Sequence, residues 1–241
     1  VFPLFRDAAG TPNVDPVLLA VIRSAHRELD SEAEPLKVED LFAYCFAILA
    51  GADYTERFRV ELETPGPRVP LTADSTLFGE VASFGRHLIW LQTFGERFRS
   101  PGGPSSLAVD PEIKWKTTPT RIPRHSKDFS YDEDSHEIVV ADGRLSGVSK
   151  EVWDFQVSGM QILKKWLGYR TAKGAGRAVS SESPLDHIRP DHWSDSWSVE
   201  LAQLVHVLQS TLNLVPTGIE LLDRVLAGPL ISADQLPDPP Q

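Results

Sequence analysis

The spacing of apolar residues changes part-way along this chain, and that change constrains the fold most strongly. In roughly the first hundred residues, apolar side chains recur at helical intervals, as Leu18, Ile22, Ala25 and Leu29 do. After the Gly-, Pro- and Ser-rich residues 100–106, short segments with the spacing of strands appear. We therefore expect an α+β fold, with an N-terminal helical part followed by a small, mostly antiparallel sheet and surrounding helices.

Local signals place the elements of the helical part. Asp15 and Pro16 form an N-cap and first-turn pair that opens one helix. A second helix is predicted over residues 38–50, where Gly51 ends it. The apolar stripe after residue 77 predicts a third helix over residues 77–98.

The second part carries strand, turn and capping signals. Residues 113–122 contain Pro119, so they predict an edge strand or an extended loop. The pair Asp142-Gly143 predicts the turn of a hairpin. Ser149 is expected to cap the helix that follows this hairpin and contains Val152, Trp153, Phe155 and Val157.

Two further helices are expected near the C-terminus. The first is predicted over about residues 196–214, and residues 217–220 have the pattern of a capping box that opens the second. Together these signals predict a helical subdomain over residues 1–105, an α+β subdomain over residues 106–232 and a disordered tail over residues 233–241.

Length and cysteine content narrow the class of protein. A chain of 241 residues can bury a sizeable core, as one large domain or two small ones. The single cysteine, Cys45, cannot form an intrachain disulfide, which favours a reducing compartment, and we expect the cytoplasm. The longest apolar run ends before Asp53 and is too short to span a membrane. The first residues contain neither a methionine nor a signal peptide, so we expect a piece of a longer polypeptide.

Basic residues gather in two segments of an otherwise acidic chain. The net charge is −10, from 24 Lys and Arg against 34 Asp and Glu. Residues 113–127 and 164–177 hold ten of the basic residues and no acidic one, so the remaining residues carry 14 basic against 34 acidic side chains. Both segments mix Trp or Tyr with Lys and Arg, a composition suited to loops that contact phosphates and base edges. The alternative is that two solvated loops happen to be basic.

Known catalytic and cofactor motifs are missing from the sequence. It contains no G-x-G-x-x-G, P-loop, H-E-x-x-H or G-x-S-x-G pattern, and no Asn/Asp-Pro-Pro-aromatic tetrapeptide. One set of potential metal ligands occurs, Asp186, His187, Asp191 and His192, but the prolines around it favour a solvated loop. We therefore expect no catalytic residue and no metal site, with a hydrolase that uses this loop as an alternative.

A series of short motifs, taken in order and spacing, is similar to one family. They are the aromatic-rich helix followed by Tyr54 and Arg57, the Pro67-Arg68-Val69-Pro70 element, the Leu145-Ser146-Gly147-Val148 strand end, the Trp153 and Val157-Ser158-Gly159 region, and the stretch from Trp166 to Arg170. Over about residues 1–228, the chain resembles the C-terminal specificity domain of type ISP restriction-modification enzymes and the related part of helicase-linked adenine-specific DNA methyltransferases. Residues 164–177 depart from the run that many relatives have there.

This resemblance implies a sequence-specific DNA target recognition domain that serves phage defence and is not an enzyme by itself. The parent would be an N6-adenine DNA methyltransferase or restriction enzyme, with S-adenosylmethionine and ATP with Mg²⁺ bound only in domains upstream of this chain. The partners would be double-stranded DNA and the methyltransferase and translocase domains of the same polypeptide, without a membrane. The alternative is a protein-interaction or scaffold domain that docks onto those other domains.

The candidate DNA-binding residues come from the two basic segments. They are Lys114, Trp115, Lys116, Arg121, Arg124, Lys127, Lys164, Lys165, Arg170, Lys173 and Arg177. Lysines are expected mainly to hold phosphates, whereas arginines can present a planar fork to guanine. Trp115 is the ring best placed to stack on a base, because lysines flank it. We expect the core to contain Trp153, Phe155, Val157 and Trp166.

Overall fold

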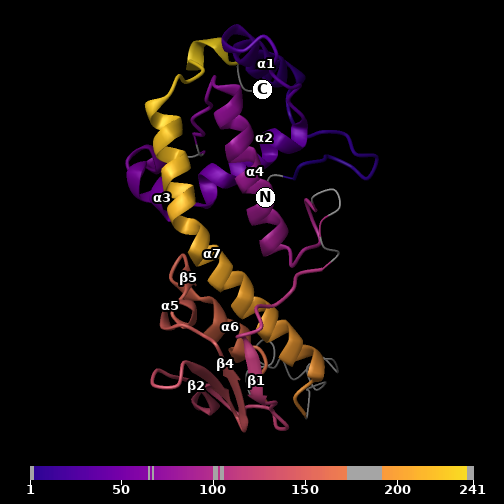
Figure 1. The fold of residues 1–241 in the computed structure, drawn as a ribbon, viewed down its shortest axis with the longest axis vertical. Helices are drawn as coiled ribbons and strands as arrows, with labels where there is room; N and C mark the ends of the chain where they lie inside the picture. Colours follow the sequence, from indigo (N-terminus) through magenta and orange to yellow (C-terminus); the bar gives the residue numbers. More distant parts are fainter. Residues whose placement is uncertain are drawn as a thin grey trace, which may run out of the picture. The chain divides into compact units, whose positions relative to one another are not determined.

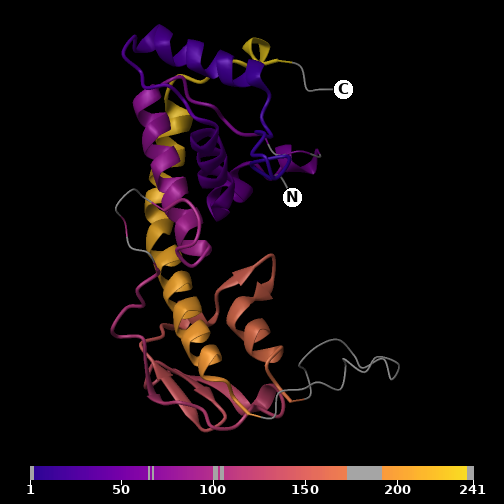
Figure 2. The ribbon, with the colours of Figure 1, turned by 90° about the vertical axis from the view of Figure 1, so that its right-hand side faces the viewer.

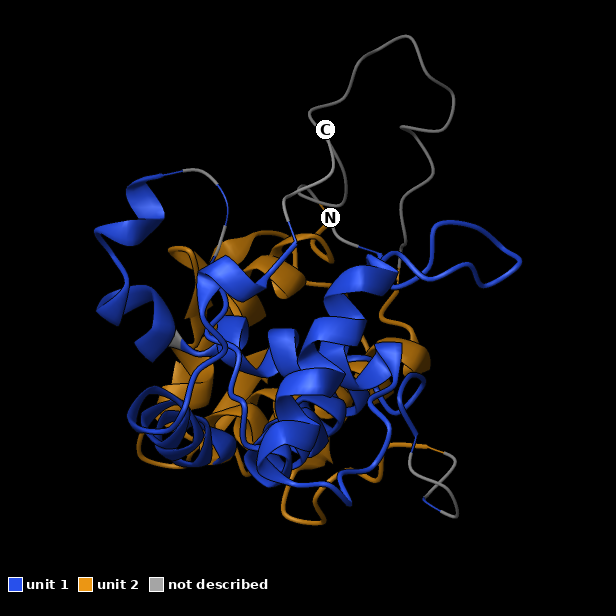
Figure 3. Ribbon diagram, turned by 90° about the horizontal axis from the view of Figure 1, so that it is seen from above, with its two compact units in different colours: residues 1–105, 214–241 blue, residues 106–213 orange. Residues whose placement is uncertain are grey.

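The computed structural model combines helices with small antiparallel sheets. It describes residues 3–64, 66, 68–99, 103, 106–172 and 192–237. This part of the chain contains a four-stranded and a two-stranded sheet among helices, which confirms the α+β class. The chain forms two compact units (Figure 3): unit 1 is residues 1–105 with 214–241, and unit 2 is residues 106–213. We expected a single boundary after residue 105, and the structure divides the chain there and again after residue 213.

Unit 1 is built from helices. Its elements are α1 (Pro16–Leu29), α2 (Val38–Ala50), α3 (Ala52–Arg57), η1 (Glu61–Glu63), α4 (Ser75–Gln92), the end of α7 (Asp195–Ala227) and η4 (Ala233–Gln235) (Figure 1). The predicted start of α1 is confirmed, because the Asp15 carboxylate accepts a hydrogen bond from the Val17 N–H at 2.8 Å. The predicted helix over residues 38–50 is confirmed as α2.

The third predicted helix is shorter than expected. It forms as α4 but ends at Gln92 rather than near residue 98. Phe94 and Gly95 adopt the left-handed backbone conformation, with φ of 55° and 83°, and this conformation cannot continue a right-handed helix. The Thr93 hydroxyl donates to the Ile89 carbonyl at 2.7 Å and so occupies one of the last helical acceptors.

The core of unit 1 centres on Tyr44. Its side chain is fully buried, and its ring stacks on that of Phe78 with centroids 4.3 Å apart. The hydroxyl donates to the Pro70 carbonyl at 2.7 Å, so the polar end of this buried residue is satisfied. Helix α4 runs alongside the C-terminal part of α7 (Figures 1 and 2), where Arg224 Nη1 lies 2.5 Å from Glu80 Oε2.

Two expectations for the C-terminal region are wrong. The predicted break between residues 214 and 217 does not occur, because α7 continues through Pro216. Apolar residues of α7 are buried on both sides of the proline, Leu208 in unit 2 and Leu221 in unit 1, and this burial offsets the lost backbone hydrogen bond. Residues 233–237 were expected in a disordered tail, but they contain η4, and Leu236 packs against the core of unit 1.

Unit 2 contains both sheets. Its elements are β1 (Lys114–Thr117), η2 (Ser126–Asp128), β2 (Phe129–Asp132), β3 (Glu137–Val140), β4 (Gly143–Ser146), α5 (Lys150–Trp153), β5 (Gln156–Val157), β6 (Met160–Gln161), α6 (Ile162–Gly168) and the beginning of α7. The larger sheet has the order β1-β4-β3-β2 and is antiparallel throughout. The edge strand expected within residues 113–122 is confirmed as β1, and the hairpin expected at Asp142-Gly143 joins β3 to β4.

Strand alternation gives the larger sheet an inner and an outer face. Trp115, Leu145 and Ile138 lie side by side on the inner face, which packs into the apolar core of unit 2. Lys114 and Ser146 are paired on the outer face, where Ser146 also lies opposite Glu137. The register therefore places the charged side chains of these strands together on the face turned away from the core.

The segment after β4 is less helical than expected. Ser149 caps α5 as predicted, because its hydroxyl accepts from the Val152 N–H at 3.3 Å, but this helix ends at Trp153. Trp153 is buried as expected, whereas Val157 is 52% exposed, so its assignment to the core is wrong. Residues 156–161 form the β5–β6 hairpin in place of a helix, and none of their side chains is buried. In the part of the chain that the structure describes, no helix is both long and apolar enough to cross a membrane.

Candidate nucleic-acid interface

The predicted DNA-binding residues that the structure describes all lie in unit 2. Lys114, Trp115 and Lys116 are on β1, Arg121, Arg124 and Lys127 are between β1 and β2, Lys164 and Lys165 are on α6, and Arg170 follows α6. Lys173 and Arg177 lie outside the described residues. The described residues of both basic segments therefore belong to the same unit, the first on β1 and the chain that leads to β2, the second on α6 and just after it.

The segment from β1 to β2 presents unpaired cations. The side chains of Lys114, Arg124 and Lys127 are exposed, and none has an ion-pair partner within the described ranges. Arg121 is weakly paired, since its side chain is 72% exposed and its Nε lies 3.8 Å from Asp142 Oδ2. Unpaired, exposed cations are the groups that hold nucleic-acid phosphates most readily.

The turn between β3 and β4 holds the loop that carries Arg121. The Asp142 carboxylate accepts hydrogen bonds from the Thr120 hydroxyl at 2.5 Å and from the Thr120 N–H at 3.1 Å. The hydroxyl of Thr120 lowers the pKa of Asp142, so this carboxylate is ionised at neutral pH. A Cβ atom at Gly143 would lie 2.3 Å from Pro119 Cγ, which shows how closely the loop packs on the turn.

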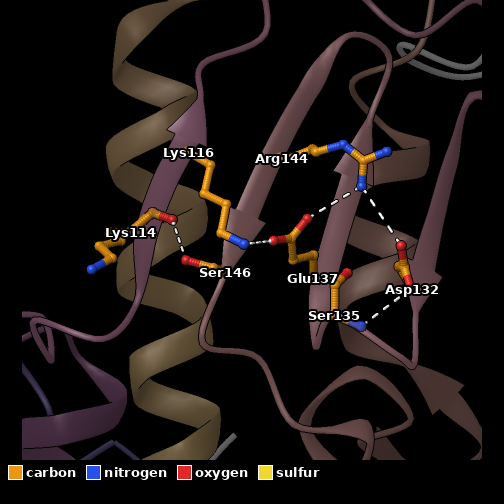
Figure 4. Close-up of polar contacts among 7 residues, drawn as sticks. All are labelled: Lys114, Lys116, Asp132, Ser135, Glu137, Arg144 and Ser146. Atoms are coloured by element: carbon orange, nitrogen blue, oxygen red, sulfur yellow. Dashed lines mark hydrogen bonds and ion pairs between the residues drawn. The ribbon is translucent and has the colours of Figure 1, made fainter.

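A charged network crosses the outer face of the sheet (Figure 4). Glu137 on β3 is buried, with 3% of its side chain exposed, and its Oε1 forms an ion pair with Lys116 of β1. Its Oε2 accepts a hydrogen bond from Nη1 of Arg144, on β4, at 3.2 Å. The same Nη1 lies 3.6 Å from Asp132 Oδ2. Hydrogen bonds from Lys116 and then Arg144 lower the pKa of Glu137, so its charge is retained at neutral pH.

Arg144 is a candidate that the sequence analysis missed. It belongs to neither basic segment, and its side chain is about half exposed. The signal that could have found it is strand alternation: in Gly143-Arg144-Leu145-Ser146, Leu145 faces the core and Arg144 must face outward.

Trp115 is anchored to the core of unit 2. Its indole Nε1 donates to the Ser198 carbonyl at 3.0 Å, and its ring meets that of Trp193 edge-on with centroids 6.5 Å apart. The ring is half-buried and packs against the apolar core. These contacts are typical of a residue with a structural role. Stacking of Trp115 on a base stays a prediction.

The basic residues on and after α6 are engaged with neighbouring side chains. Lys165 Nζ lies 5.0 Å from the ring centroid of Tyr169. The guanidinium of Arg170 stacks on Trp166 at 3.6 Å from the ring centroid, and Nη2 lies 2.8 Å from Glu200 Oε2. Because these contacts already fix Arg170, it would need to give up its ion pair before it could reach a base.

One further lysine of the predicted DNA-binding residues, Lys164, lies on α6. Lys164 Nζ lies 3.9 Å from Asp154 Oδ1 and 5.2 Å from the ring centroid of Trp153. Its side chain is 38% exposed, so it is weakly paired and accessible.

The potential metal ligands fall mostly outside the described residues. Asp186, His187 and Asp191 are not described, and His192 is exposed. Among the side chains that the structure describes, no group of three or more could hold a metal ion.

The α+β unit that contains both sheets also carries the described residues of both basic segments. Comparisons with known proteins give the family. Residues 1–204 match the family described as the Type ISP C-terminal specificity domain, so the chain belongs to that family. This membership confirms the resemblance found in the sequence and the expected class of function, a specificity domain of restriction-modification enzymes.

Comparison with solved structures finds matches at low sequence identity. The structure described as "cryoEM structure DrdV-DNA complex" has a TM-score of 0.58 and 16% identity over 92% of this chain. The Type ISP restriction-modification enzyme LlaGI in complex with a DNA substrate mimic has a TM-score of 0.46 and 16% identity over 80% of the chain. This chain covers only 20% of the DrdV chain and 16% of the LlaGI chain. No curated protein matches the chain significantly.

Proposed function

We propose that unit 2 recognises a specific sequence in double-stranded DNA on behalf of a longer restriction-modification enzyme. Family membership over residues 1–204 is the observation that carries this proposal. The similarity of fold to a chain solved as a DNA complex supports it. The unpaired cations of the β1–β2 segment are chemically suited to the task, since phosphate contacts supply much of the affinity of such domains.

The side chains divide by chemistry into two roles. Lys114, Lys127 and Lys164 carry compact charges on flexible stems, which hold phosphates without reading the sequence. Arg121 and Arg124 are exposed and can present two parallel N–H groups to the O6 and N7 atoms of guanine. The acidic remainder of the chain would limit indiscriminate binding, because its net charge repels the phosphate backbone.

The chemistry of the parent enzyme would lie elsewhere. We infer that this chain transfers no methyl group and cleaves no bond by itself, and that its parent is an N6-adenine DNA methyltransferase or restriction enzyme. S-adenosylmethionine and ATP with Mg²⁺ would bind domains upstream of this chain, in the cytoplasm. Methyl transfer from labelled S-adenosylmethionine to DNA by the pure chain would contradict this inference.

Selection of duplexes tests the recognition function. The chain is incubated with duplexes that contain a randomised segment, and the retained DNA is sequenced. We expect one short sequence to be enriched over all others. Retention without enrichment would leave only non-specific binding, and no retention would contradict the proposal.

Single substitutions test whether the β1–β2 segment of unit 2 contacts DNA. Lys114→Ala and Lys127→Ala should each weaken binding to all duplexes alike and reduce the salt slope of log K by about 0.9 per lost phosphate contact. Lys37→Ala and Arg97→Ala are matched controls in unit 1, because these exposed cations lie among acidic residues and should leave the slope unchanged. A larger loss from the controls would place the DNA surface on unit 1.

One observation favours a second function, docking onto other domains of the parent. The β5–β6 hairpin exposes two apolar side chains next to each other, Val157 at 52% and Met160 at 47%. Contiguous apolar surface can mark a protein contact, and these two side chains would form part of it. Substitution of both by Ser should leave duplex binding unchanged if docking is their role.

A further inference from the structure

The outer face of the sheet carries Arg144, whose guanidinium is held by carboxylates through one nitrogen atom, Nη1. Nη1 of Arg144 is held by the buried carboxylate of Glu137 at 3.2 Å and lies 3.6 Å from Asp132 (Figure 4). Within the part of the chain that the structure describes, Nη2 and Nε of Arg144 have no hydrogen-bond or ion-pair partner. One edge of the guanidinium is thus anchored, and the edge formed by Nε and Nη2 points away from both carboxylates (Figure 4).

Glu137 is itself held in place by two cations. Its two carboxylate oxygens are divided between Lys116 and Arg144, which approach from β1 and β4. Only 3% of the Glu137 side chain is exposed, and breaking either contact would leave a buried charge without its partner, which favours the observed directions of both cations. Both cations stay about half exposed, which leaves their outer sides accessible to a ligand.

The free edge has the donor pattern that a guanine requires. Recognition of guanine in the major groove uses two parallel N–H donors directed at O6 and N7, and Nε with Nη2 form such a pair. An arginine that is already fixed loses less side-chain entropy on binding than one that moves freely. The major groove can also accommodate β-structure, and Lys114 on the same face is free to hold a phosphate.

Two other arginines of unit 2, Arg170 and Arg121, are less well prepared for this task. Arg170 is stacked on Trp166 and paired with Glu200. Arg121 is 72% exposed and lies 3.8 Å from its nearest acidic partner, so it is not held in one direction. Arg144 combines exposure with a fixed orientation.

We propose that Arg144 reads a base of the target, with its free edge on guanine, and that Glu137 is the positioning residue that aims it. This inference rests on the proposed function, because it assigns one residue of the recognition surface. It makes the outer face of the sheet β1-β4-β3-β2 the side that meets the major groove. Lys116 shares the same carboxylate and would lie beside Arg144 at the DNA.

The duplex selection described above tests this assignment with variants. Arg144→Ala should lower the preference for one base pair of the selected sequence roughly 5- to 150-fold and leave the other positions unchanged. Arg144→Lys keeps the charge but lacks the fork, so it should not restore that preference. Glu137→Gln should relax the same position, because the neutral amide no longer fixes the guanidinium.

Arg224→Ala is the matched control. Arg224 is 43% exposed and paired with Glu80, as Arg144 is paired with Glu137, but it lies in unit 1 and should not change any preference. Urea unfolding of each variant checks that the sheet is intact, and Arg144→Lys keeps the test decisive where Arg144→Ala is unstable.

The possible failures are distinguishable. If the unsubstituted chain enriches no sequence, the proposed function fails and the assignment of Arg144 fails with it. If the unsubstituted chain enriches a sequence and Arg144→Lys keeps every preference, only the assignment of Arg144 is overturned. An equal loss of affinity for all sequences would show that Arg144 holds a phosphate and reads no base.

Discussion

The carbonyl oxygen of Ala43 in α2 lies directly against Gly85 in α4. A Cβ atom added at Gly85 would be 1.9 Å from that oxygen, so the two helices can approach this closely only because residue 85 has no side chain. The contact involves backbone on one side, and backbone cannot move aside as a flexible side chain can.

Gly85→Ala is therefore expected to destabilise the chain by about 1–3 kcal/mol, since the helices must separate. Gly79→Ala is the control on the same helix, where an added Cβ meets nothing within 4 Å. It should instead stabilise α4 by about 0.5–1 kcal/mol. Urea unfolding followed by circular dichroism measures both, and equal effects of the two substitutions would contradict the close approach.

Trp153→Ala should destabilise unit 2 by about 3–5 kcal/mol, because it removes a large buried ring. Only 6% of Trp153 is exposed, and its ring stacks on Tyr131 with centroids 5.9 Å apart. Tyr169→Ala is the control, because Tyr169 is 53% exposed and should change the free energy of unfolding little. An unchanged melting temperature for Trp153→Ala would show that this ring is not part of the core.

Glu137 should make the stability of the chain depend on pH. Hydrogen bonds from Lys116 and Arg144 lower its pKa below the ordinary 4.5. A carboxylate with a lowered pKa in the folded state stabilises the fold above its unfolded pKa, and the contribution is lost as pH falls through the folded value. The difference in stability between the unsubstituted chain and Glu137→Gln should thus be largest near pH 7 and shrink below about pH 4.5. A difference that stays constant from pH 7 to pH 3 would contradict the ion pairs.

Cys45 should react slowly with alkylating reagents. Burial raises the pKa of its thiol to about 11 from an ordinary 9, and the thiolate is the reactive form. At pH 7.5 we expect alkylation by iodoacetamide to be about 100-fold slower in the folded chain than in urea, as mass spectrometry would measure. Comparable rates in the two states would show that the thiol is accessible and unperturbed.

Local sequence signals determined several elements of this protein by themselves. Asp15 with Pro16 fixed the start of α1, Asp142-Gly143 fixed the β3–β4 turn, and Ser149 fixed the start of α5. Each signal acts through a hydrogen bond or a backbone preference within a few residues, so its effect does not depend on the rest of the fold. The order and spacing of short motifs also indicated the family, because both can be read from the amino-acid sequence without the fold.

Only the tertiary structure decided which charged residues are available for recognition. Arg170 and Lys116 belong to basic segments, but packing pairs them with Glu200 and Glu137, which are 30 and 21 positions away in the sequence. Arg144 lies outside those segments, yet strand register places it on the outer face of the sheet beside a buried carboxylate. The continuity of α7 through Pro216 was decided in the same way, because burial on both sides of the proline outweighs its local preference. Such contacts join residues that are distant in sequence, and the energies of burial and pairing that select them arise only when the chain has folded.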